Sequence, residues 1–162
     1  MKIGVSGHRW RDGADWDWVR ARIDEYVTRT RIGAGYTSLA PGADQIFASS
    51  ALDHGKRLVA VIPVCRGRIE LEDTDKPSFD RFCERAKKII RVKGETPDDA
   101  FLKSGKRVVN LVDRMIFVWD GAPSRGLGGT ADIVAYAEKK RKAGVILDPI
   151  ACTMRRLDQS EG

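Results

Sequence analysis

The chain has 162 residues, of which 42% are hydrophobic and 32% charged, and this is the length and composition of one globular domain. It carries 29 basic and 23 acidic residues, a formal net charge of +6, and nearly all of the surplus lies after Lys76. A basic surface can bind polyanions, but a run such as Lys139 to Lys142 also stabilises the end of a helix through its dipole. Because no aromatic residues alternate with the basic ones in these runs, we favour the structural interpretation.

Membrane insertion, secretion and a metal site are all disfavoured. The longest apolar run, Leu58 to Cys65, is interrupted by Pro63 and is too short to cross a bilayer, and we expect no signal peptide. The three cysteines are scattered and form no CxxC pair, and the two histidines leave little for a metal site. These features predict a protein of the reducing cytoplasm that has no metal and no other cofactor.

Short apolar runs alternate with amphipathic stretches along the whole chain. In chain order we predict a strand at 2–6, a helix that begins after Asp12 or Asp15, a strand at 36–40, a helix from about 43, and a strand at 58–62 that ends at Pro63. There follow a mobile polar loop at 66–76, a helix from 79 that runs into the apolar residues 89–92, a helix from 97, a strand at 115–119, a helix from about 131 to 142, and a strand at 144–147. The tail after Cys152 is expected to be frayed.

This alternation of strands and helices predicts a single α/β domain at residues 1–150, followed by a C-terminal tail at 151–162. The domain is expected to be Rossmann-like and doubly wound, with a mainly parallel sheet covered by helices on both faces. In such sheets, ligands bind beyond the carboxyl ends of the strands. The loops at that edge are therefore the candidate site.

Two of these loops follow the first two strands. The first contains Ser6, Gly7, His8 and Arg9, in which the glycine allows a close approach of the backbone to a ligand and the other side chains add donors. The second contains Pro41, Gly42, Ala43 and Asp44. Its turn predicts a helix that begins near Ala43 with free amides suited to an anion, whereas Asp44 suits a ribose hydroxyl.

The third loop, from Asp120 to Thr130, is the most informative. It lies between a buried strand and an amphipathic helix, and it holds three glycines in four positions at Gly126, Gly128 and Gly129. Such a loop predicts a nest of backbone amides for phosphate, with Arg125 as the countercharge and Thr130 as a cap or a phosphate ligand. The sequence contains no P-loop, no GxGxxG after the first strand and no GxSxG nucleophile elbow.

Together the three loops resemble those of the SLOG superfamily, which includes the Lonely Guy phosphoribohydrolases, the DNA-processing protein A family and nucleotide-sensing domains. The resemblance implies a Rossmann-like nucleotide pocket in which the glycine loop holds phosphate or ribose. In the phosphoribohydrolase branch a glutamate follows the loop threonine by three residues, and that position is Ile133 here. Asp132 lies one residue away, which rotates a side chain by about 100° around a helix.

Three functions follow from these residues. We favour a sensor or sequestering domain that binds a nucleotide or a nucleotide derivative, with Ser6 to Arg9, Gly42 to Asp44, Asp120, Arg125 and the loop glycines as ligand-binding residues. The first alternative is an enzyme that hydrolyses the N-glycosidic bond of a nucleoside monophosphate, for which Asp44 and Asp132 are the candidate catalytic carboxylates. The second alternative is a protein that binds single-stranded nucleic acid.

The resemblance also implies a homo-oligomer, because SLOG relatives commonly pair through helices that flank the sheet. Trp10, Trp16 and Trp18 are too many aromatic residues for one helix start to bury. We therefore expect some of them to face a partner subunit or the ligand.

Overall fold

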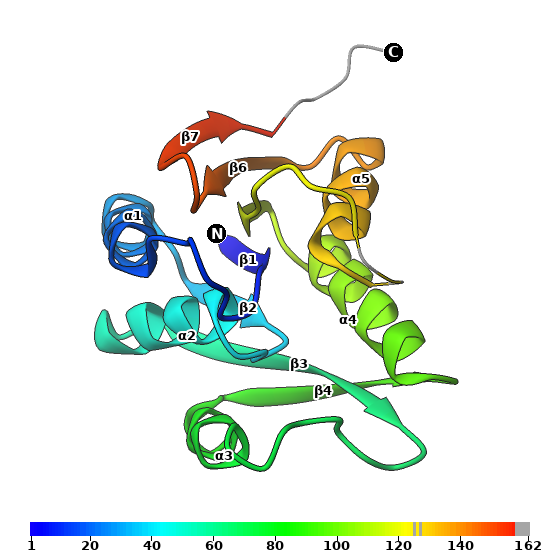
Figure 1. Ribbon diagram of the computed structural model, residues 1–162. Coiled ribbons are helices and arrows are strands. Elements are labelled where there is room, and N and C mark those ends of the chain that lie inside the picture. The colour runs from blue at the N-terminus through cyan, green and yellow to red at the C-terminus, as the bar shows by residue number, and fades with distance from the viewer. Residues whose placement is uncertain (125, 127, 158–162) are drawn as a thin grey trace.

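We describe residues 1–124, 126 and 128–157 from a computed structural model of the chain (Figure 1). The strands are β1 (Lys2–Gly7), β2 (Ala34–Thr37), β3 (Arg57–Cys65), β4 (Lys88–Gly94), β5 (Arg114–Val118), β6 (Ala143–Asp148) and β7 (Thr153–Arg156). The helices are α1 (Trp16–Arg29), α2 (Ala43–Asp53), α3 (Lys76–Arg85), α4 (Pro97–Leu111) and α5 (Thr130–Lys139). Within the described ranges, no helix is long and apolar enough to cross a membrane.

All seven strands form one sheet in the order β4-β3-β2-β1-β5-β6-β7. Every pairing is parallel except that of β7 with β6. From β1 the chain proceeds outward through β2, β3 and β4, and then crosses through α4 to β5 on the other side of β1. The order of the strands therefore reverses between β1 and β5, and in open parallel sheets this is the position at which ligands bind. The doubly wound α/β prediction is confirmed.

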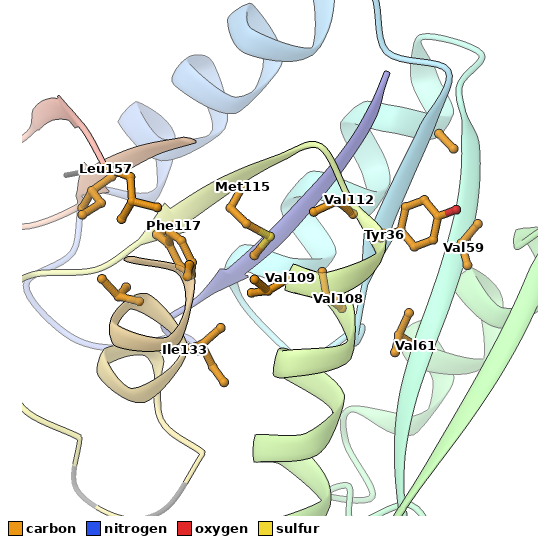
Figure 2. Close-up of a cluster of buried hydrophobic side chains, with 14 residues drawn as sticks. Tyr36, Val59, Val61, Val108, Val109, Val112, Met115, Phe117, Ile133 and Leu157 are labelled. Atoms are coloured by element: carbon orange, nitrogen blue, oxygen red, sulfur yellow. The ribbon is translucent and has the colours of Figure 1, made fainter. Parts of the chain in front are cut away.

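The helices cover both faces of the sheet. In Figure 1, α1 and α2 lie on one side of the strands, and α4 and α5 lie on the other. Figure 2 shows the core beneath α4 and α5, in which Val108, Val109 and Ile133 of the helices pack against Met115 and Phe117 of β5. On the opposite face, a second core joins α1 and α2 to β1 and β5, and a third joins α2 and α3 to β3.

Several boundaries differ from the sequence predictions. The strand predicted at 36–40 is β2 at Ala34–Thr37, and the helix predicted to end at 142 ends at Lys139. The strand predicted to end at Pro63 continues to Cys65, because its pairing with β4 extends that far. Beyond Ala60, where β2 ends, β3 has β4 as its only neighbouring strand. Proline is tolerated in such an edge-like stretch. The apolar run 89–92 belongs to the edge strand β4 rather than to a helix. Part of the tail expected to be frayed after Cys152, residues Thr153–Arg156, instead forms β7, whose backbone pairs with β6; residues 158–162 lie outside the described residues.

Candidate functional site

A cavity of about 560 Å³ opens at the carboxyl edge of the sheet, beyond the ends of the paired strands β1 and β5. Nine of the predicted ligand-binding residues line it: Ser6, Gly7, His8, Arg9, Asp44, Gly126, Gly128, Gly129 and Thr130. Gly42, Ala43 and Asp120 support the lining loops from behind, and Arg125 lies outside the described residues. Because ligands bind beyond the carboxyl ends of parallel strands, the three predicted loops meet at one cavity, although Ser6 and Thr130 lie 124 positions apart in the chain.

His8 joins the first loop to the third. Its Nε2 accepts a hydrogen bond of 3.1 Å from the backbone N–H of Asp120, and Nη1 of Arg11 lies 3.4 Å from the same nitrogen. The other nitrogen, Nδ1, therefore carries the proton when the ring is neutral. The Asp120 carboxylate lies 3.2 Å from the His8 Nε2 and accepts a 2.8 Å hydrogen bond from Arg11.

These contacts set the charge at the sheet edge. Burial lowers the pKa of His8 below 6.5, and the Arg11 charge acts in the same direction, while the Asp120 charge opposes them. For Asp120, burial is the largest influence and raises the pKa, but the Ala122 N–H and the charges of His8 and Arg11 outweigh it and lower the pKa overall. At neutral pH the His8 imidazole is therefore neutral and lies between the Asp120 carboxylate and the Arg11 guanidinium.

The second loop is a structural support for the first. Gly42 has φ +100° and ψ −128°, and a Cβ there would lie 2.6 Å from the His8 carbonyl oxygen. The N–H of Ala43 donates to that same oxygen over 3.1 Å. The prediction of a free amide at Ala43 is therefore wrong, because this amide fixes the position of the first loop.

Asp44 is a buried carboxyl at the cavity wall, with a fractional exposure of 5%. Burial raises its pKa to about 7. Hydrogen bonds from loop 37–40 act in the opposite direction, and their donors are the N–H of Ala40, the hydroxyl of Thr37 and the N–H of Ser38. Most of the acceptor capacity of Asp44 thus holds this loop against the start of α2.

The glycine loop differs in detail from the predicted anion nest. Asp132 accepts a 3.0 Å hydrogen bond from the N–H of Gly128, so this amide is already occupied by a carboxylate. The expectation that Gly128 binds phosphate through its amide is wrong for this reason. No hydrogen bond between described residues uses the N–H of Gly129, Thr130 or Ala131 as a donor to a side chain or to another loop. These three amides at the start of α5 are the ones available to an anion.

Three further residues, one of them on the crossover helix α4, line the cavity although the sequence did not predict them there. Phe101 of α4, predicted as a core residue, lines the cavity, and the Arg9 guanidinium lies over its ring at 4.9 Å from the centroid. Arg9 is exposed and takes part in none of the ion pairs recorded for the described residues. Arg11 and Ser38 also line the cavity. The helical spacing predicts that Phe101 faces the protein interior, but it does not predict which end of the sheet the Phe101 side chain lies against.

Of the three neighbouring tryptophans, two are partly packed. Trp16 and Trp18 lie against the core beneath α1. Trp10 remains 49% exposed and meets Trp16 edge to face at 4.8 Å between ring centroids. The contact of Trp10 with a partner or a ligand stays a prediction. In the part of the chain that the structure describes, no three His, Cys, Asp or Glu side chains lie close enough to hold a metal ion.

Comparison with solved structures identifies the fold. The chain superposes on DNA processing protein A from Helicobacter pylori with a TM-score of 0.68 at 17% identity, over 91% of this chain and 65% of that one. The corresponding protein from Streptococcus pneumoniae gives a TM-score of 0.64 at 19% identity, over 91% of this chain and 50% of that one. The molybdenum cofactor carrier protein of Chlamydomonas reinhardtii gives 0.55 at 18% identity, over 93% and 79%. Neither protein-family models nor the sequences of curated proteins give a match.

These similarities show that the chain has a Rossmann-like α/β fold, which it shares with part of DNA processing protein A. The chain spans half the length of the Streptococcus protein and 65% of the Helicobacter protein. It therefore corresponds to part of those molecules.

Proposed function

We propose that this chain binds a nucleotide or a phosphorylated nucleotide derivative in the cavity at the carboxyl edge, as a sensor or sequestering domain. The observation that carries the proposal is the meeting of the exposed Arg9 and the start of α5 on the walls of one cavity. A helix start offers backbone N–H groups and a positive dipole, and an arginine offers a forked pair of donors. Both suit a phosphate group.

The base and the sugar need a less polar part of the same cavity. Phe101, Trp119 and Ile133 supply apolar wall, and the Arg9 guanidinium already lies over the Phe101 ring. Planar cations and aromatic rings are both surfaces on which a nucleobase stacks. A volume of about 560 Å³ lies within the usual range of small-molecule sites, roughly 300–1,000 Å³.

The test is calorimetric titration with mononucleotides, dinucleotides, ADP-ribose and cyclic nucleotides. We expect at least one to bind the wild type, and Arg9→Ala to weaken it by about 1.5–3 kcal/mol, the usual value of a charge-assisted hydrogen bond. Arg31→Ala is the matched control, because Arg31 is an exposed arginine just before β2, at the opposite edge of the sheet. Absence of binding by the whole panel, or equal weakening by both variants, contradicts the proposal.

Asp44 favours one alternative, an N-glycosidic hydrolase acting on a nucleotide. It is a carboxyl on the cavity wall that exchanges its proton near neutral pH, as a general acid or base must. Its bonds to loop 37–40 oppose this role, because they hold the carboxyl in place as a structural acceptor. Release of free base from nucleoside monophosphates by the wild type, abolished in Asp44→Asn, would establish the enzyme; wild-type protein that releases no base rejects it.

Contacts between lysines and a tyrosine on α4 and α5 favour a second alternative, a surface that binds single-stranded nucleic acid. Lys106 of α4 and Lys140 at the end of α5 both lie over the ring of Tyr136, at 5.1 and 5.6 Å from its centroid. The basic residues are thus next to an aromatic ring in space although not in sequence. Such binding would fall steeply with salt. If oligonucleotides do not bind at about 50 mM salt, where phosphate contacts are strong, this alternative is rejected.

A further inference from the structure

A chain of hydrogen bonds reaches the cavity from the interior at Ser38. Ser104 of α4 is fully buried, and its hydroxyl oxygen lies 2.6 Å from the carbonyl oxygen of Val61 in β3. The same hydroxyl lies 2.8 Å from the hydroxyl of Ser38, which follows β2 and lines the cavity. Three elements that are far apart in sequence therefore meet through two hydroxyl groups.

The direction of each hydrogen bond in this chain is fixed. A carbonyl oxygen can only accept, so the single hydrogen of Ser104 is donated to Val61. The contact between the two serines then requires Ser38 to donate, because Ser104 has no second hydrogen to offer. Ser38 lines the cavity and has committed its only hydrogen to the protein interior, so its hydroxyl can offer a ligand there only lone pairs.

From this direction we infer that Ser38 is an acceptor-only contact, which selects ligands that present a hydrogen-bond donor at this point of the cavity. The inference rests on the proposed function and narrows its ligand class. Three groups of a nucleotide carry such a donor, namely a ribose hydroxyl, an exocyclic amino group of the base, and the ring N–H of guanine or uracil. A group that can only accept, such as a carbonyl, would face the Ser38 oxygen without a hydrogen between them and would be disfavoured.

The experiment compares pairs of ligands that differ in one donor. For the sugar, AMP, GMP, CMP and UMP are each compared with their 2′-deoxy-2′-fluoro and 3′-deoxy-3′-fluoro analogues, which replace one hydroxyl by a group without a hydrogen. For the base, AMP is compared with purine riboside 5′-monophosphate, and CMP with zebularine 5′-monophosphate, because in each a hydrogen atom replaces the amino group and no ring N–H is added. In the wild type we expect one pair to differ by about 3- to 10-fold in Kd, the usual value of one hydrogen bond.

Two variants test whether Ser38 recognises a donor on the ligand or only supports the structure of the cavity. In Ser38→Ala the ratio of Kd values for that pair should fall to about 1, because the parent ligand alone loses its contact. In Ser104→Ala the Ser38 hydrogen is released from the interior, so the ratio should narrow although residue 104 does not line the cavity. A thermal melt of each variant shows that it is folded before its ratios are compared.

The outcomes are distinct. If Ser38→Ala weakens the parent and every analogue by one common factor, or weakens none of them, Ser38 does not read a donor and the inference is wrong. A wild type that discriminates within no pair also overturns it. If none of the nucleotides binds the wild type, the proposed function itself fails, and this result cannot be confused with a loss of discrimination.

Discussion

The backbone N–H of Asp120 donates a 3.1 Å hydrogen bond to Nε2 of His8, and the carboxylate of the same aspartate lies 3.2 Å from that nitrogen. One residue thus approaches the imidazole with a donor and with a negative charge. The donor requires a neutral ring, whereas the charge favours a protonated one. Burial, helped by the Arg11 charge, outweighs the Asp120 charge and lowers the pKa of His8, so the link between the β1 and β5 loops is sensitive to acid.

We therefore expect His8 to make the fold less stable as the pH falls. Its pKa in the folded protein is below the ordinary 6.5, so the unfolded chain takes up this proton first and stability is lost as the pH drops below 6.5. His8→Gln keeps an acceptor for the Asp120 N–H but does not titrate. Urea unfolding at about pH 7.5 and about pH 5.5 should show a smaller loss of unfolding free energy in the variant. An equal loss in both proteins contradicts this prediction.

Asp44 acts in the opposite direction over an overlapping pH range. Its pKa is raised by burial to about 7, so its contribution to stability is present below the ordinary value of 3.8 and is lost as the pH rises through 7. The unfolding free energy of the wild type minus that of Asp44→Asn should therefore decrease from about pH 4 to about pH 8. Denaturant titrations of both proteins at four or more pH values measure this difference. A difference that stays constant across the range would show that Asp44 does not titrate there.

The sequence predicts the sheet and its loops because those features are local. Apolar runs such as 115–119 mark buried strands, and the carboxyl-edge rule then brings Ser6 to Arg9 and Gly126 to Thr130 to one cavity. Phe101 and Ser38 could not be placed in this way. Phe101 reaches the cavity through the crossover helix α4, whose position depends on packing against β1, β3 and β4 rather than on its own spacing. Ser38 directly follows β2, which ends at Thr37, whereas the sequence predicts a strand that continues to residue 40.

The hydrogen bonds of the turns were equally hidden from the sequence. A helix start predicts free amides, but whether a nearby oxygen already accepts from them depends on three-dimensional geometry. At Ala43 that acceptor is the carbonyl of His8, and at Gly128 it is the carboxylate of Asp132. The exposed edge β7 was missed because its four residues, Thr153 to Arg156, show no buried face.

Gly42 tests the packing of the second loop against the first. We expect Gly42→Ala to cost about 2–4 kcal/mol of stability, because a side chain is strained at φ +100° and its Cβ would collide with the backbone of His8 and Arg9. Gly67→Ala is the control, since Gly67 also has positive φ (+73°) but its added Cβ meets nothing within 4 Å. The control should cost only about 1 kcal/mol, the price of the backbone conformation alone. Equal losses in urea unfolding would show that the contact with the first loop is unimportant.

Gly129 tests whether the start of α5 holds the phosphate. Its φ of −66° is accessible to any residue, so the strain of a side chain comes from space: a Cβ would lie 2.6 Å from the Ser124 hydroxyl oxygen. Gly129→Ala should therefore weaken both folding and nucleotide binding, and adding Ser124→Gly should restore folding by removing the collision. We expect nucleotide binding to stay at least about tenfold weaker in the double variant, because a methyl group beside the Gly129 N–H hinders the close approach of an anion. Calorimetry on the double variant and on Ser124→Gly alone measures the two nucleotide affinities. The affinity of Ser124→Gly relative to the wild type shows how much the Ser124 hydroxyl contributes to binding. If the double variant binds as well as Ser124→Gly alone, the glycine loop is a structural turn and the phosphate lies elsewhere in the cavity.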